Sequence, residues 1–77
     1  MPALRNISGR ELVKVLCNRF GFITKRQKGS HVVLVKEYAG GKVGCVVPLH
    51  GELKTGTLKG LLKQACISEE EFGDAMQ

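Results

Sequence analysis

The sequence predicts a small α+β domain in which a three-stranded antiparallel sheet is covered on one face by helices. Near both ends of the chain apolar residues recur with helical spacing, whereas the middle is rich in β-branched residues and glycine turns. A chain of 77 residues is long enough for one modest hydrophobic core. We therefore expect a single domain over residues 1–77, with the order α-β-β-β-α and a short C-terminal helix.

The first helix is expected over residues 9–19. Ser8-Gly9-Arg10-Glu11 has the form of a capping box, and Gly21 supplies the left-handed residue that commonly ends a helix. Helical spacing places five apolar residues on one face: Leu12, Val13, Leu16, Cys17 and Phe20. It places three polar residues on the outward side: Arg10, Lys14 and Asn18.

Three strands follow, over residues 22–27, 31–37 and 43–47. A turn at Lys28 to Ser30 separates the first two strands, and Ala39-Gly40-Gly41-Lys42 is a hairpin signal between the second and third. Pro48 ends the third strand because it has no amide hydrogen to donate to a ladder. The middle of the chain is therefore expected to be an antiparallel meander.

The hairpin signal also predicts the pairing register of the second and third strands. If Gly40 and Gly41 form a two-residue loop, Ala39 pairs with Lys42 and His31 lies opposite His50. One face of the sheet then carries Val32, Leu34, Cys45, Val47 and Leu49. The other face, away from the helices, carries His31, Val33, Val35, Val46 and Pro48.

The C-terminal part predicts two helices. The longer begins near Thr55, whose hydroxyl is expected to cap it, and buries Leu58, Leu61, Leu62 and Ala65. Lys59 and Lys63 make its opposite face basic. Ser68-Glu69-Glu70-Glu71 is a second capping box that opens the last helix, and we expect Phe72 and Met76 to reach back to the core.

The composition favours a polyanionic partner and excludes several other classes. The net charge is +5, and four acidic residues gather between positions 69 and 74, so the rest of the chain is more basic than the total indicates. A solvated lysine-rich surface is the alternative. Because the chain has neither a membrane-length apolar run nor a secretory signal, we expect a cytoplasmic protein without a membrane partner.

The cysteines indicate neither a disulfide framework nor a metal site. Cys17, Cys45 and Cys66 are odd in number and far apart, and we interpret them as small buried apolar residues. Even with His31 and His50 added, no closely spaced pair of ligands is present, so we expect no metal. A two-layer domain of this length leaves no room for a cofactor cleft, so we expect no cofactor.

The segment Lys28-Gly29-Ser30-His31 is the strongest candidate for chemistry. It is a basic glycine turn that brings a histidine to the start of a strand, and imidazole exchanges protons readily near neutral pH. Lys25, Arg26 and Lys28 would attract a polyanion. We hypothesise that His31 performs acid-base chemistry on RNA; the alternative is a strand-end residue that hydrogen-bonds the turn.

Four segments together resemble the HicA (YcfA-like) family, the small toxins of bacterial and archaeal toxin-antitoxin pairs. They run in order along the chain between Ser8 and Phe72: the glycine-serine-histidine after a basic strand, Val47-Pro48-Leu49-His50-Gly51, residues 52–58 and residues 64–72. The expected element order is also that of a double-stranded RNA-binding domain. Fold order alone does not assign a function.

The resemblance implies a double-stranded-RNA-binding-domain-like fold, ribosome-independent cleavage of mRNA, and inhibition by a cognate HicB-type antitoxin. It also implies that His31 is the catalytic histidine. Two residues depart from the family pattern, because Thr55 and Cys66 stand where proline and glycine are frequent. Both lie at predicted helix boundaries, so they bear on local stability more than on chemistry.

A ribonuclease without a metal can use the 2′-hydroxyl of its substrate as nucleophile, and then needs a base, an acid and positive charge near the phosphate. His31 could serve as either base or acid, and His50 is either the second group or an anchor for its loop. The candidates for phosphate binding are Lys25, Arg26, Lys28, Ser30, Lys54 and the amides of Gly56 and Thr57 at a helix N-terminus. Ser30 is also an ordinary turn residue.

The leading hypothesis is therefore a metal-independent endoribonuclease toxin with mRNA as substrate and a HicB-type antitoxin as partner. The alternatives are a non-catalytic RNA-binding module that uses the same basic surface and a protein-binding adaptor. Few aromatic residues are available for base stacking, which predicts weak sequence specificity. The valines on the sheet face away from the helices are expected to meet the antitoxin or another copy of the chain.

Overall fold

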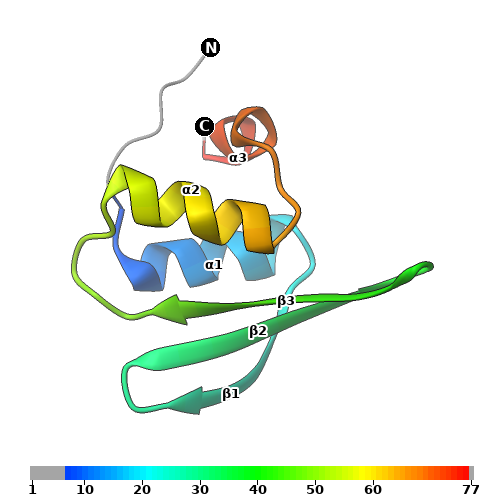
Figure 1. The fold of residues 1–77 in the computed structure, drawn as a ribbon, viewed down its shortest axis with the longest axis horizontal. Coiled ribbons are helices and arrows are strands. Elements are labelled where there is room, and N and C mark those ends of the chain that lie inside the picture. The colour runs from blue at the N-terminus through cyan, green and yellow to red at the C-terminus, as the bar shows by residue number, and fades with distance from the viewer. Residues whose placement is uncertain (1–6, 77) are drawn as a thin grey trace.

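The computed structural model describes residues 7–76 and confirms the predicted α+β architecture. A three-stranded antiparallel sheet of order β1-β2-β3 carries all the helices on one side (Figure 1), as in a double-stranded-RNA-binding-domain-like fold. The elements are α1 (Gly9–Arg19), β1 (Ile23–Lys28), β2 (His31–Tyr38), β3 (Gly41–Pro48), α2 (Thr55–Gln64) and α3 (Glu69–Ala75).

Helix α1 has the predicted bounds. The Ser8 hydroxyl accepts a hydrogen bond of 3.0 Å from the Glu11 amide, and Gly21 has a φ of +77° just beyond the helix. Leu12 and Leu16 are buried, and the three residues predicted to face outward are exposed. The local sequence signals at both ends of this helix are therefore sufficient to delimit it.

The hairpin between β2 and β3 differs from the prediction by two residues. Tyr38 pairs with Gly41, so the loop is Ala39 and Gly40, and His31 pairs with Pro48 rather than with His50. The predicted pairing of the two histidines is wrong. The reason lies in Gly41, whose φ of +142° provides the unusual backbone at the exit of the turn, so that this glycine begins β3 instead of completing the loop.

The predicted faces of the sheet survive this shift, because side chains alternate with a period of two. The residues on the helix side of β2 and β3 are buried: Val32, Leu34, Cys45 and Val47. His31, Val33, Val35, Val46 and Pro48 lie on the opposite side, which we call the outer face. Leu49, predicted to extend the buried face, follows the end of β3 and is half-buried against the core.

Strand β1 contains an irregularity that the sequence did not reveal. Its pairing with β2 shifts between Thr24 and Arg26, so that Lys25 is an extra residue in a β-bulge. The bulge lets Thr24 and Gln27 share the helix side of the sheet, although strict alternation would separate them. Arg26 and Lys28 consequently lie on the outer face, opposite Val33 and His31.

The C-terminal helices begin where predicted, but with one difference in capping. The N-cap of α2 is Lys54, which makes no side-chain cap bond, and Thr55 is already the first helical residue, so the predicted Thr55 cap is wrong. In α3 both bonds of the Ser68–Glu71 capping box are present at 3.0 Å. Hydrogen bonding to the Glu71 carboxylate, first from the Ser68 backbone amide and then from the Ser68 side chain, holds the pKa of Glu71 below its usual value.

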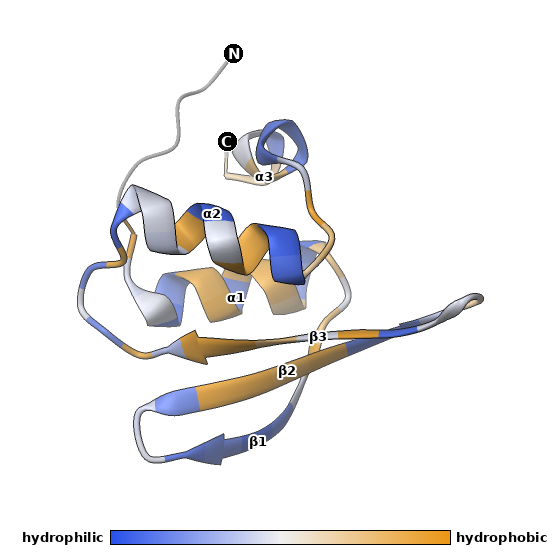
Figure 2. Cartoon of the chain, in the orientation of Figure 1, coloured by the Kyte–Doolittle hydropathy of each residue, from blue (hydrophilic) through white to orange (hydrophobic). Residues whose placement is uncertain are grey.

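The core lies between the sheet and the helices. Figure 2 shows the hydrophobic segments of β2, β3 and the helices facing this layer, whereas β1 is hydrophilic. The predicted core residues of α2 are buried, as is Phe72 of α3, and Met76 packs against them. No helix within residues 7–76 is long and apolar enough to cross a membrane.

The three cysteines carry free thiols in three different environments. Cys45 is buried in the core, and this burial raises the pKa of its thiol to about 11. Cys17 is half-buried, but Cys66 is exposed, so the expectation of three buried cysteines is wrong at Cys66. The reason is that Cys66 lies just beyond the end of α2 in a left-handed conformation, with a φ of +60°.

The end of α2 is a Schellman motif built on Cys66. Its amide bonds to the Lys63 carbonyl at 3.1 Å, and the Ile67 amide bonds to the Leu62 carbonyl at 2.9 Å. A residue with a Cβ atom pays about 1–2 kcal/mol for the left-handed conformation, whereas glycine adopts it freely. The backbone at position 66 is therefore that of a glycine although the residue is cysteine.

We predict that Cys66→Gly stabilises the protein by about 1 kcal/mol, because it removes the backbone strain at a position whose side chain makes no core contact. Urea denaturation measures the change in unfolding free energy. Cys66→Ala is the matched control, because it removes the thiol but keeps the Cβ atom. An equal gain in the alanine variant would contradict the backbone explanation.

Candidate functional site

His31 lies at the end of the sheet where four segments converge: the β1–β2 turn, the end of β3 and the first turns of α1 and α2 (left in Figure 1). In the turn before it, Gly29 takes a φ of +59°, and the Gly29 carbonyl accepts a hydrogen bond from the side-chain Nε2 of Gln27 at 3.1 Å. The Ser30 carbonyl accepts a bond of 2.6 Å from the Leu49 amide. His31 thus has a defined backbone and an exposed side chain.

Two rows of side chains cross the outer face at this end of the sheet. The first row is Lys28, His31 and Pro48, and the second is Arg26, Val33 and Val46. Directly opposite residues in an antiparallel pair have Cβ atoms about 5 Å apart. The Lys28 ammonium can therefore reach an anion that also contacts the His31 imidazole, with Arg26 one row further along.

His50 lies at the same end of the sheet but is not a cross-strand partner of His31. It follows Leu49, which is bonded to the β1–β2 turn, and its own carbonyl accepts a hydrogen bond of 2.9 Å from the Gly9 amide. The side chain of His50 is exposed. Its backbone therefore ties the loop after β3 to the start of α1, through a bond that does not involve the imidazole.

The start of α1 packs unusually closely on this loop. A Cβ atom at Gly9 would fall on the Pro48 carbonyl oxygen and would lie 2.9 Å from the Leu49 Cα atom. Only glycine permits this approach, which lets the Gly9 amide reach His50. Gly9 therefore determines how the end of β3 and the segment after it are seated against the helix layer.

The predicted phosphate-binding residues fall into two groups. Arg26, Lys28 and the exposed bulge residue Lys25 belong to β1, beside His31, whereas Lys54, Gly56 and Thr57 are exposed at the N-terminus of α2. The second group is connected to the start of α1 through the Leu53 amide, which donates to the Ile7 carbonyl at 2.6 Å. Because α2 lies on the helix side, the structure does not bring this group to the outer face.

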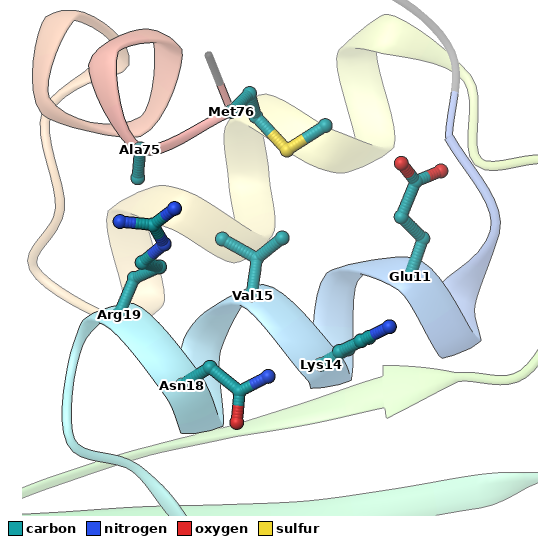
Figure 3. A pocket seen from close by; sticks show the side chains of 7 residues that line it. All are labelled: Glu11, Lys14, Val15, Asn18, Arg19, Ala75 and Met76. Carbon is teal, nitrogen blue, oxygen red and sulfur yellow. The ribbon is translucent and has the colours of Figure 1, made fainter.

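Three hollows formed by the described residues on the helix side contain none of the predicted catalytic residues. One, of about 350 Å³, lies between α1 and the end of α3 and mixes both signs of charge with apolar residues (Figure 3): Glu11, Lys14, Val15, Asn18, Arg19, Ala75 and Met76. A second, of about 340 Å³, includes Tyr38 and Cys66. The third, of about 200 Å³, lies between α1 and β1 behind the His31 turn and includes Gln27 and Leu49. Within residues 7–76, no three side chains of the metal-binding types form a cluster.

Sequence reasoning missed two residues that support the site. Gln27 holds the turn through its side-chain amide, and Pro48 stands directly across from His31. The polar side chain two positions before Gly29 was a usable signal for the first, because glutamine amides often bond turn carbonyls. The position of Pro48 opposite His31 depends on the strand register, and the register predicted from the hairpin sequence differs from the observed one by two residues.

Comparison with known proteins gives one family match. A family model described as HicA toxin of bacterial toxin-antitoxin matches residues 9–67, which include α1, the whole sheet and α2. No curated protein sequence matches the chain. The matched range contains Lys28, His31 and His50.

We predict that Gly9→Ala destabilises the protein by about 1–3 kcal/mol, because the new methyl group overlaps the Pro48 carbonyl. Thermal and urea unfolding measure the loss. Gly60→Ala is the matched control: Gly60 lies inside α2 with nothing within 4 Å of the added Cβ atom. There alanine should stabilise by about 0.5–1 kcal/mol through helix propensity. Equal effects at the two positions would show that close approach does not matter.

Proposed function

The chain belongs to the HicA toxin family, and we propose that it is an endoribonuclease that cleaves mRNA through His31 without a metal ion. Family membership makes the chain the toxin component of a toxin-antitoxin pair and implies a cognate antitoxin as partner. The observation that carries the catalytic proposal is the pairing of His31 with Lys28 at the exposed end of the sheet.

This arrangement matches the needs of RNA cleavage by internal attack. A base removes the proton of the 2′-hydroxyl, the 2′-oxygen forms a bond to the neighbouring phosphorus, and the bond from phosphorus to the 5′-oxygen breaks as an acid protonates that oxygen. His31 supplies one of the two proton transfers. The Lys28 ammonium beside it stabilises the negative charge that develops on the phosphate.

His50 is our candidate for the second proton transfer. It lies at the same end of the sheet as His31, and its side chain is exposed. Ser30 has a turn role through its carbonyl, and its hydroxyl is a secondary candidate for phosphate contact.

The toxin acts in the cytoplasm, where mRNA is available, and its antitoxin is a HicB-type protein.

A non-catalytic RNA-binding module is the second candidate function. The observed register favours it in one respect, because His31 lies opposite Pro48 and no second histidine is its cross-strand partner. The same cations would then bind RNA without cleaving it. The two functions differ in whether RNA is cut, which makes them separable by one experiment.

We predict that the protein cuts an unstructured mRNA fragment in the presence of a chelator, and that His31→Ala lowers the rate about 100-fold or more. Electrophoresis of end-labelled RNA measures the rate. Because His31 is exposed, the variant should unfold within about 0.5 kcal/mol of the parent. His50→Ala, assayed beside it, tests the second proton transfer. Full activity in His31→Ala, or loss of cleavage on chelation, contradicts the proposal.

We predict that Lys28→Ala weakens RNA binding and reduces the slope of log affinity against log salt by about 0.7, the value for one phosphate contact on a single strand. Binding is measured in the His31→Ala background, which keeps the RNA intact. Lys63→Ala is the matched control, because Lys63 is an exposed lysine of α2 on the helix side. An unchanged slope in the Lys28 variant means that Lys28 contacts no phosphate.

A further inference from the structure

The outer face of the sheet is divided along its length into a cationic edge and an apolar remainder. Its β1 edge carries Arg26 and Lys28, followed by Ile23, which is 65% exposed. From His31 to Val35 the middle and the β3 edge are apolar apart from His31 itself: Val33, Val35, Gly44, Val46 and Pro48, with the pair Glu37 and Lys42 beyond them at the far end. Figure 2 shows that β1 is largely hydrophilic, whereas β2 and β3 contain hydrophobic segments, to which the residues of both faces contribute.

The distribution of acidic residues makes this face the more favourable one for a polyanion. The three strands contain a single acid, Glu37, which pairs with Lys42 at the end away from His31. The basic face of α2, by contrast, stands near the acids of α3, and Lys59 Nζ lies 4.0 Å from Glu69 Oε2. Four of the seven acidic residues belong to α3, on the helix side: Glu69, Glu70, Glu71 and Asp74.

We infer that one strand of RNA lies along the outer face, with its phosphates on the β1 cations and its sugars and bases over the valines of β2 and β3. This inference rests on the proposed function and assigns the surface that holds the substrate. The RNA strand ends its path over the sheet at the row of Lys28, His31 and Pro48, where the scissile phosphate meets the imidazole.

A single strand fits this face and a duplex does not. Three strands spaced by about 4.8 Å make a surface about 10 Å wide, and the cations near His31 lie along its β1 edge. A duplex presents two phosphate backbones, and near His31 the β3 edge offers the second one Gly44, Val46 and Pro48, whereas Lys42 lies at the far end opposite Glu37. Val46, which is 44% exposed, is instead suited to apolar contact with a sugar or base.

The bulge at Lys25 is what aligns this surface. In a regular strand, Thr24 and Gln27 would lie on opposite faces of the sheet. In the structure both line one hollow beside α1. The extra residue keeps Arg26 and Lys28 in step with Val33 and His31 while Thr24 turns inward. Bulges commonly serve to direct side chains at functional edges.

The test measures RNA binding in the His31→Ala background by fluorescence anisotropy of a labelled, unstructured RNA. We expect Arg26→Ala to weaken binding several-fold, and Val46→Glu to weaken it about tenfold or more by placing a negative charge under the strand. The matched controls lie on the helix side: Lys63→Ala for the cation and Tyr38→Glu for the exposed hydrophobic residue. Both controls should stay within about twofold of the parent. A duplex of the same sequence should compete at least tenfold less well than the single strand.

The possible results separate this inference from the proposed function. If Arg26→Ala and Val46→Glu bind RNA like the parent while Lys63→Ala or Lys54→Ala loses affinity, the inference is wrong. The proposal that the protein with His31 intact cleaves RNA then still stands. If Val46→Glu releases only the antitoxin, the face belongs to that protein and the inference is likewise overturned. Equal competition by the duplex overturns the single-strand assignment. If none of the variants in the His31→Ala background binds RNA, and the protein with His31 intact does not cut RNA, the proposed function fails as well.

Because Val46→Glu replaces an apolar residue, its folding is checked by thermal unfolding. Arg26→Ala provides a second variant at a fully surface position of β1, where the strand is exposed along its whole length. Reduced RNA affinity in both variants, at unchanged melting temperature, supports the inference. Reduced affinity in Val46→Glu alone, together with a lower melting temperature and an unaffected Arg26→Ala, counts against it.

Discussion

The close approach of Gly9 to the end of β3 is the constraint on which the rest of this small fold depends. It lets the first turn of α1 sit directly on Pro48 and Leu49, with the Gly9 amide bonded to the His50 carbonyl. Leu49 in turn bonds to the carbonyl of Ser30. Because Gly9 has no side chain, these hydrogen bonds can link the helix layer, the end of the sheet and the turn that carries His31. The same contacts therefore determine both the stability of the fold and the geometry of the candidate site.

The sheet combines two roles on its two faces. The inner face supplies the strand half of the core, while the outer face stays open, with exposed apolar residues that a monomer would ordinarily cover. Lysine and arginine residues together with a bulge on an edge strand also protect a sheet against pairing with another chain. That explanation accounts for an exposed, charged β1, but it does not account for a histidine where the β1–β2 turn and the end of β3 meet the first turns of two helices.

The two departures from the HicA pattern have simple structural meanings. Thr55 is the first residue of α2, the position at which proline is favoured because its missing amide hydrogen would have no partner there. Cys66 occupies the left-handed residue of a Schellman motif, where glycine is favoured. In both places the backbone keeps the conformation that suits the usual residue, so the substitutions alter local free energy and leave the placement of the sheet and of His31 unchanged.

Local signals in the sequence determined the element order, the bounds of α1, the capping of α3 and the inward and outward faces of β2 and β3, because capping, turn chemistry and strand alternation act over a few residues. The same period of two explains why the faces were predictable although the register was not: a shift of two residues preserves every face and still replaces His50 by Pro48 opposite His31. The tertiary structure alone decided that register, the bulge at Lys25, the exposure of Cys66 and the separation of the β1 cations from the N-terminus of α2. Each of these depends on backbone geometry and on contacts between distant segments, which no short stretch of sequence encodes.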